Sequence, residues 1–308
     1  MDKLLSICIP TWNRAQFLSK TLESLYLQSG IKDYCEIVVC DNDSHDGTRE
    51  TVQHFGEKHG NLKYLKNDKN VGAGANLLQA VEAAEGKYAL FLSDKAVLRP
   101  GILDKTLSLL REHEPSVLFM LNGHMNGPPE MVYSGLDFDG FVSIVSFWST
   151  CVSEIIVSKR AFDRIEKTEQ RESRLIQTYW LFQIIDQSPE SAVCNAPFIV
   201  DQDIGAKSGY NLFEVFITNY LGLYKPYLDS GSLRGKTYSK EKRKLLLNFV
   251  FPWFLQTVIF RRHKYDTSRA YRIITSQYGL VASSVQFCKY LWGRCLSFFL
   301  RSINARIN

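Results

Sequence analysis

Short apolar runs and longer amphipathic segments alternate along the first third of the chain. The apolar runs, each of a length typical of a buried strand, lie at 4–10, 34–40, 62–65 and 88–92. Segments with helical periodicity follow them at 17–26, 48–55 and 77–84, and again from 102. Repeated strand–helix alternation is typical of a parallel sheet that has helices on both faces and right-handed crossovers. The pattern therefore predicts an α/β fold built on a mostly parallel, Rossmann-like sheet.

The alternation weakens after about residue 115. Residues 141–157 have the pattern of extended, β-prone chain, and 174–185 that of a helix. A further strand is expected over 192–200, and mostly helical chain from 208.

Charge divides the chain into two regions. Residues 1–231 contain 22 Lys and Arg against 30 Asp and Glu, whereas 232–308 contain 15 against 2. The net charges of −8 and +13 sum to the +5 of the whole chain. We therefore expect an α/β domain over 1–231 and a basic helical region over 232–308, which would face a polyanion.

The remaining composition excludes several classes of protein. A content of 45% hydrophobic and 22% charged residues is that of an ordinary globular protein. The seven cysteines form no CxxC pair, which favours reduced thiols over a disulfide framework or a zinc site. We expect no signal peptide and no membrane-spanning helix, because the sequence has neither a leader pattern nor 18 uninterrupted apolar residues.

Polar residues follow each of the first four predicted strands. These residues are Thr11, Asn13 and Arg14, then Asp41 and Asn42, then the loop 70–76, and finally Ser93, Asp94 and Lys95. The ends of parallel strands share one edge of a sheet, and ligands bind in the crevice outside that edge. The carboxylate of Asp41 can accept hydrogen bonds from a nucleobase or a ribose. Glycines in the loop 70–76 would let its backbone approach a ligand closely, although a simple turn with a helix cap has the same composition.

Four segments together resemble family 2 glycosyltransferases of the GT-A fold, in particular bacterial enzymes that build O-antigen or capsule repeats. They are Ser6–Arg14, Val38–Thr48, Asn70–Asn76 and Gly86–Asp94. The resemblance fades after Asp104. It implies a nucleotide-diphosphate-sugar half over 1–105, an acceptor half over 106–231, and a donor that is most often a UDP-sugar.

The resemblance also implies which residues hold the donor. They are Pro10, Thr11, Asn13, Arg14, Asp41, Asn42, Asn70, Gly72, Asn76, Ser93 and Asp94. Asp41 would hold the base or ribose, the loop 70–76 would close over the nucleoside, and the corner at Ser93 to Lys95 would lie at the diphosphate.

This corner departs from the family pattern. Family members carry Asp-x-Asp there, and its last carboxylate ligates Mg²⁺ or Mn²⁺. The acidic positions fall on Ser93 and Lys95 in one register and on Asp94 and Ala96 in the other, so at least one carboxylate is missing. Asp94 is the metal ligand that remains, and the ammonium of Lys95 can neutralise a diphosphate as a metal would. We therefore expect weak or absent metal dependence and no organic cofactor; the alternative is a degenerate, inactive site.

Two further Asp-x-Asp strings lie outside a strand-end context. They are Asp137 with Asp139 and Asp201 with Asp203, and we interpret them as surface or loop carboxylates.

An inverting transfer needs a carboxylate that removes the proton of the acceptor hydroxyl. Family members usually place it near the start of a helix in the second half, and no carboxylate of this chain falls there. Glu154 and Glu172 are the candidates, with Asp94 and Lys95 completing the expected catalytic set. A surface salt-bridge partner is the alternative role of each glutamate.

The C-terminal region combines basic clusters with an apolar helical stripe. The stripe consists of Val281, Val285, Cys288, Trp292, Cys295 and Phe299. Such helices suit an anionic membrane surface, which residues 240–308 would contact. A helical bundle or homo-oligomer is the alternative, and nucleic acid is not expected.

These observations lead to one leading hypothesis. The protein would be a hexosyltransferase-type glycosyltransferase, peripheral on the cytoplasmic face of the membrane, that adds a sugar to a lipid-linked or polysaccharide acceptor. The alternative is a pseudoenzyme of the same fold that binds a nucleotide or a partner protein.

Overall fold

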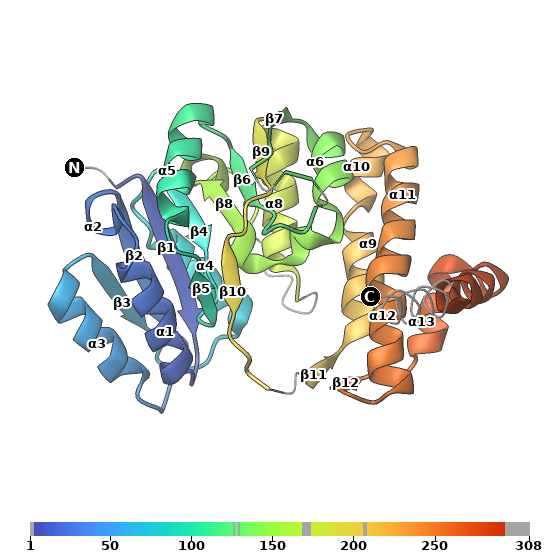
Figure 1. Ribbon diagram of the computed structural model, residues 1–308, viewed down its shortest axis with the longest axis horizontal. Helices are drawn as coiled ribbons and strands as arrows, with labels where there is room; N and C mark the ends of the chain where they lie inside the picture. Colours follow the sequence, from blue (N-terminus) through green and yellow to red (C-terminus); the bar gives the residue numbers. More distant parts are fainter. Residues whose placement is uncertain (1–2, 126, 129, 168–173, 206–207, 293–308) are drawn as a thin grey trace, which may run out of the picture. The chain divides into compact units, whose positions relative to one another are not determined.

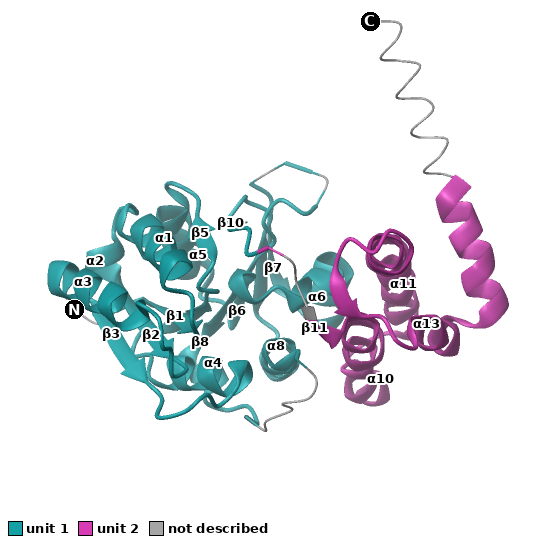
Figure 2. Cartoon of the chain, turned by 90° about the horizontal axis from the view of Figure 1, so that it is seen from below, with its two compact units in different colours: residues 1–204 teal, residues 205–308 magenta. Residues whose placement is uncertain are grey.

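The computed structural model describes residues 3–125, 127–128, 130–167, 174–205 and 208–292. The chain divides into two compact units, Met1–Ile204 and Gly205–Asn308 (Figure 2). The sequence placed the boundary between 231 and 232, which falls inside the second unit.

Unit 1 contains a mixed sheet that, over the described residues, has eight strands in the order β3-β2-β1-β4-β8-β6-β9-β7 (Figure 1). The strands are β1 (Leu5–Thr11), β2 (Cys35–Asp41), β3 (Leu62–Lys66), β4 (Tyr88–Phe91), β6 (Val117–Met120), β7 (Val132–Leu136), β8 (Ile155–Ser158) and β9 (Ser191–Cys194). The first four are mutually parallel, as the sequence predicted, and β6 is parallel to β9. Strand β8 runs antiparallel to both β4 and β6, so its beginning lies at the edge where those strands end.

Helices cover both faces of this sheet. Their bounds are α1 (Ala15–Tyr26), α2 (Ile31–Tyr34), α3 (Thr48–His59), α4 (Ala73–Glu82), α5 (Ile102–His113), α6 (Phe138–Val145), α7 (Lys159–Phe162) and α8 (Ile176–Gln187). Figure 2 shows α1 and α5 on one side of the sheet and α4 and α8 on the other. The predicted α/β fold is therefore confirmed.

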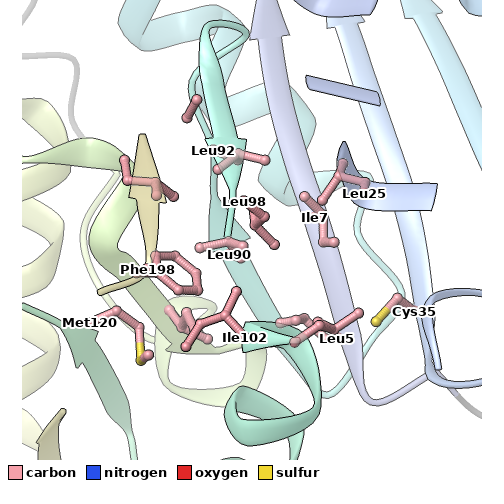
Figure 3. Close-up of a cluster of buried hydrophobic side chains, with 14 of the residues drawn as sticks. Leu5, Ile7, Leu25, Cys35, Leu90, Leu92, Leu98, Ile102, Met120 and Phe198 are labelled. Atoms are coloured by element: carbon pink, nitrogen blue, oxygen red, sulfur yellow. The ribbon is translucent and has the colours of Figure 1, made fainter. Parts of the chain in front are cut away.

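The alternation of side chains in the strands produces one core on each face. Leu5, Ile7 and Leu90 belong to the cluster shown in Figure 3, which Leu25 of α1 and Ile102 of α5 complete. Burial of each such leucine or isoleucine stabilises the fold by roughly 1.5–3 kcal/mol relative to exposure. On the other face, Phe91 of β4 packs edge-to-face against Trp180 of α8 and Phe162 of α7.

The prediction of extended chain over 141–157 is wrong for most of its length. The structure has α6, then the 3-10 helices η1 (Ser146–Thr150) and η2 (Val152–Glu154), and then β8. Asp137 starts α6, because its side chain accepts a hydrogen bond from the backbone N–H of Gly140 at 2.7 Å. The buried residues Phe138, Phe141, Val142 and Val145 recur at helical spacing, so packing overrides the β propensity of this apolar segment.

The expected strand over 192–200 is divided in two. Strand β9 joins the large sheet, whereas β10 (Ile199–Asp201) pairs antiparallel with β5 (Ala96–Leu98). This separate pairing places Asp201 opposite Ala96, next to the corner that follows β4.

Unit 2 is mostly helical, as expected. Its elements are β11 (Ser208–Asn211), η3 (Glu214–Asn219), α9 (Tyr220–Gly222), α10 (Lys225–Ser230), α11 (Gly235–Leu245), η4 (Leu246–Val250), α12 (Phe251–Phe254), η5 (Leu255–Ile259), β12 (Lys264–Asp266), α13 (Ala270–Tyr278) and a helix over 280–292. Within its core, the buried carboxylate of Glu241 accepts a hydrogen bond from Tyr220 at 3.0 Å. Across the described ranges, no helix has the length and apolar character that crossing a bilayer requires.

Candidate active site

The ends of β1 and β2 bring Thr11 and Asp41 into register as neighbours. The carboxylate of Asp41 is fully buried and accepts hydrogen bonds from the N–H of Ser44 at 2.9 Å and the hydroxyl of Tyr64 at 2.7 Å. Burial and the neighbouring carboxylate raise the pKa of Tyr64, which keeps its hydroxyl a proton donor. A carboxylate has about four acceptor positions, so a nucleoside could use those that remain. Its role toward a base or ribose stays a prediction.

Asparagine side chains fix the loop before α4. The amide of Asn42 donates to Oδ1 of Asn70 at 2.9 Å, and its Oδ1 accepts from the N–H of Val71 at 2.8 Å. Asn76 is buried and donates to the carbonyl of Cys40 at 2.8 Å, while Asn67 donates to Asn76 at 3.0 Å. The loop is thus tied to the end of β2 before any ligand binds.

Gly72 and Pro10 frame the same region. Gly72 precedes α4 with φ of 91°, a backbone conformation that favours glycine, and a Cβ there would meet open space. Pro10 lies within β1 and pairs with Cys40 of β2. Asn13 has a positive φ of 51°, and its Oδ1 accepts from the N–H of His45 at 2.8 Å, so the first two polar loops are joined.

Asp94 connects β1, α1 and β4. Its carboxylate is 3% exposed, and it accepts from the hydroxyl of Thr11 and from Nη1 of Arg14, both at 3.0 Å. Its backbone carbonyl accepts from the hydroxyl of Thr21 at 2.8 Å. Burial raises the pKa of Asp94, and the positive charge of Arg14 opposes this effect. The structure therefore unites three predicted donor-site residues in one hydrogen-bonded group.

Lys95 in the corner after β4 lies beside Asp201, a carboxylate that the sequence predicts at the surface or in a loop. Nζ of Lys95 lies 2.6 Å from Oδ2 of Asp201, and the two side chains are 17% and 51% exposed. The N–H of Gln202 donates to the carbonyl of Lys95 at 2.9 Å, and its side chain donates to the carbonyl of Phe17 at 3.0 Å. Asp201 is thus exposed, as the sequence predicted, and is in addition an ion-pair partner of the corner. Asp139 is buried and so differs from the predicted surface position.

The donor set at this corner does not fit a divalent metal. The guanidinium of Arg14 already pairs with Asp94, and the next residue is a second cation, so a divalent metal there would face two positive charges. Ala96, at the other acidic position of this register, offers a methyl group. Among the described residues, no cluster of three or more His, Cys, Asp and Glu side chains is placed to hold a metal ion.

Glu154 is the last residue of η2, directly before β8, and therefore lies at the same edge. The hydroxyl of the preceding Ser153 accepts from the N–H of Ser93 at 3.0 Å, which joins this segment to the corner. Glu154 is 2% exposed, and Nε2 of His124 lies 3.4 Å from its Oε1. Burial raises the pKa of Glu154, and the interaction with His124 opposes that rise. The other candidate, Glu172, lies outside the described residues.

Four residues that contact the candidate site residues were not predicted from the sequence. They are Tyr64, Asn67, His124 and Asp201, each of which reaches the site through contacts distant in sequence. The Asp-x-Asp string at 201–203 was the one local signal for Asp201.

The order of the strands and the polar groups at their ends define a GT-A glycosyltransferase fold. Residues 6–131 match the model of Glycosyl transferase family 2, and this match identifies that region as a family 2 domain. Abequosyltransferase RfbV of Salmonella typhimurium is 35% identical over 101 residues, 32% of this chain and 30% of its own length. The Campylobacter jejuni GalNAc(5)-diNAcBac-PP-undecaprenol beta-1,3-glucosyltransferase is 30% identical over 146 residues, 46% of this chain and 47% of its own. The matched segments thus span less than half of these relatives.

Solved structures extend the similarity of the fold beyond the matched sequence. TarS 1-349 of Staphylococcus aureus superposes with a TM-score of 0.60 and 16% identity, covering 82% of this chain and 74% of that one. The mannosyltransferase PcManGT of Pyrobaculum calidifontis, solved with GDP-Man and Mn²⁺, has a TM-score of 0.52 and 15% identity, covering 95% and 88%.

Proposed function

We propose that the protein is an inverting glycosyltransferase that transfers a sugar from a nucleotide-diphosphate sugar to a lipid-linked or polysaccharide acceptor in bacterial surface glycan synthesis. The observation that carries this proposal is the group formed by Thr11, Arg14 and Asp94, which joins the ends of two parallel strands. Ligands bind at such an edge, and the tied asparagine loop adds a surface suited to a nucleoside.

The comparisons support a nucleotide-sugar donor. TarS has been solved with UDP and with UDP-GlcNAc, and PcManGT with GDP-Man. We propose a UDP-sugar carrying a hexose as the donor of this protein. The name of the Campylobacter enzyme gives an undecaprenol-diphosphate-linked saccharide as its acceptor, which supports a lipid-linked acceptor for this protein.

In the proposed reaction, the acceptor oxygen forms a bond to the anomeric carbon. The bond from that carbon to the diphosphate breaks, and its electron pair leaves with the nucleoside diphosphate. The ammonium of Lys95 stabilises the negative charge of the leaving group, in the role that a metal has in other GT-A enzymes. Glu154 accepts the proton of the acceptor hydroxyl and becomes a neutral acid.

We propose that the basic region contacts an anionic membrane surface. Val281, Val285 and Trp292 lie on the helix over 280–292 and are 75%, 47% and 76% exposed. The positive charge of the surrounding region favours an anionic surface as the partner of this stripe. Cys295 and Phe299, which continue the stripe in the sequence, lie outside the described residues.

The pseudoenzyme alternative is not favoured. The presence of a lysine ammonium and of the buried carboxylate of Glu154 at the same edge supports an active enzyme.

The test measures binding of UDP by the full-length protein with isothermal titration calorimetry and release of UDP from UDP-GlcNAc, UDP-glucose and UDP-galactose. We expect binding by the wild type and UDP release from at least one sugar. Asp94→Asn should weaken both, whereas Lys20→Ala on the exposed side of α1 should change neither. Binding without release from these donors or from GDP-mannose, with membrane extracts supplied as acceptor, would support the pseudoenzyme.

A further inference from the structure

The carboxyl group of Glu154 is buried, and its two oxygens have different surroundings. Its Oε1 faces His124, whereas Oε2 has no hydrogen-bond partner within the part of the chain that the structure describes. A buried polar atom without a partner costs roughly 1–3 kcal/mol, so its presence requires a reason. A ligand hydroxyl is a partner that would satisfy Oε2.

The imidazole of His124 is held in a fixed orientation. Its ring stacks on the indole of Trp148, with the ring centroids 3.6 Å apart and the planes 2° from parallel. The turns that present these two rings contain non-glycine residues with positive φ, Asn122 at 52° and Ser146 at 58°. Such backbone conformations are strained and are retained where a particular geometry is required.

This pair lies beside the proposed donor site. Ser153 bonds to the backbone of Ser93, and the carboxylate of Asp201, which holds Lys95, acts electrostatically on Glu154. The side chain of His124 is 27% exposed, so the pair is also within reach of solvent.

We propose that His124 and Glu154 act as one unit, in which Glu154 takes the proton of the acceptor hydroxyl at Oε2 and His124, held by Trp148, orients the carboxylate and favours its ionised form. This inference rests on the proposed function and adds a positioning residue to it. The proton passes from the acceptor oxygen to Oε2 as that oxygen bonds to the anomeric carbon, and His124 neither gains nor loses a proton in the step.

The charges that face Glu154 make this arrangement testable through pH. Burial raises the pKa of Glu154, His124 and a side-chain hydrogen bond with Asn122 lower it, and Asp201 raises it. The base must be ionised, so the rate should rise with pH through the pKa of Glu154. His124→Asn removes a group that lowers this pKa and should move the acidic limb of the profile to higher pH. Asp201→Asn removes a group that raises it and should move the limb to lower pH.

The experiment measures kcat and kcat/KM for UDP release by the full-length protein as a function of pH. The substrate is the UDP-sugar from which the wild type releases UDP fastest. Glu154→Gln should lower kcat by about 10²–10⁴-fold with little change in the donor KM. His124→Asn and Asp201→Asn should displace the limb in opposite directions. Trp148→Phe should retain more activity than Trp148→Leu, because a second aromatic ring can still support the imidazole. His113→Asn, which alters a His–Glu pair on α5 with a separation of 3.9 Å, is the matched control and should leave the profile unchanged.

The possible outcomes separate this inference from the proposed function. If the wild type binds and releases UDP but His124→Asn leaves the limb in place, the inference is overturned and the proposed function stands. If the wild type does not bind UDP, both are overturned. A second measurement needs no substrate. The Tm of the wild type and of Glu154→Gln is measured across pH, and the pH at which the two values begin to differ is compared between variants. That pH should also rise with His124→Asn and fall with Asp201→Asn.

Discussion

Nζ of Lys95 and Oδ2 of Asp201 lie 2.6 Å apart, although 106 residues separate them in the sequence. The pairing of β10 with β5 places Asp201 opposite Ala96. In one register, Ala96 is one of the two positions at which the Asp-x-Asp pattern would have a carboxylate. Asp201 holds the ammonium of Lys95 close to the proposed diphosphate site. A diphosphate at this corner would compete with Asp201 for the ammonium of Lys95.

The first prediction concerns this cation. Lys95→Ala should lower UDP release by about 10²–10³-fold, because a preorganised charge opposite the leaving group is lost. The wild type should keep its activity in EDTA, and Lys95→Arg should retain part of it. Lys225→Ala, which removes the exposed ion pair to Asp229 at 2.7 Å, is the control and should have wild-type activity. Loss of wild-type activity in EDTA, with Lys95→Ala unimpaired, would show that a metal supplies the charge.

The second prediction concerns Arg14 and Asp94. Arg14→Ala leaves a buried carboxylate without its cation and should lower the free energy of unfolding by about 1–3 kcal/mol. Urea unfolding measures the change. Lys63→Ala is closely matched, because the Lys63–Glu85 pair has the same 3.0 Å separation and the lysine the same 40% exposure, but its carboxylate is 75% exposed. That variant should change stability by less than about 0.5 kcal/mol; equal losses would mean that burial of Asp94 is unimportant.

The third prediction concerns the stability effect of Glu154. Burial raises its pKa in the folded protein above the value in the unfolded chain, so the folded state keeps the proton to higher pH. The free energy of unfolding therefore falls as pH rises from the unfolded pKa through the folded one. Glu154→Gln should consequently be more stable than the wild type at neutral pH, and the difference should shrink on acidification. A variant less stable than the wild type at every pH would indicate a structural carboxylate.

The fourth prediction concerns the stripe on the helix over 280–292. Val285→Ser should weaken binding of the full-length protein to phosphatidylglycerol-containing vesicles by about fivefold to tenfold, because apolar surface no longer enters the interface. Trp292→Ser should have a larger effect. Val200→Ser in unit 1 is the matched control, since Val200 is 48% exposed and Val285 47%. Cosedimentation with vesicles measures binding, and self-association without vesicle binding would favour the oligomer instead.

The first four strands could be predicted because each is a short, largely apolar segment that alternates with a helical one, although Glu36 and Lys63 interrupt the second and third. Leu5–Thr11 and Cys35–Asp41 differ from the predicted runs by one residue at each end. The segment 141–157 was mistaken because its apolar residues satisfy both extended and helical patterns, and contacts with distant helices select the helix.

The donor residues could be proposed from the sequence because they follow strands that lie side by side. His124 and Asp201 were not proposed, although Asp201 directly follows the predicted strand over 192–200 and His124 follows the apolar run 117–121. His124 gains its position from a stack on Trp148 and Asp201 from pairing with a strand more than a hundred residues earlier. Such partners depend on tertiary packing, which local patterns do not encode.

Strand β8 runs antiparallel to both of its neighbours, and this reversal has an evolutionary consequence. Because β8 is antiparallel to β4 and β6, the segment before β8 places Glu154 at the edge where those strands end. This segment is separate in sequence from the loops that contain Asp41, Asn76 and Asp94. In the proposed enzyme, loops that face the acceptor can therefore diversify while the cradle proposed for the donor is left untouched. Remodelling of that one rim would then change the glycan product, which agrees with a family-model match that ends at residue 131 inside a shared fold that continues well beyond it.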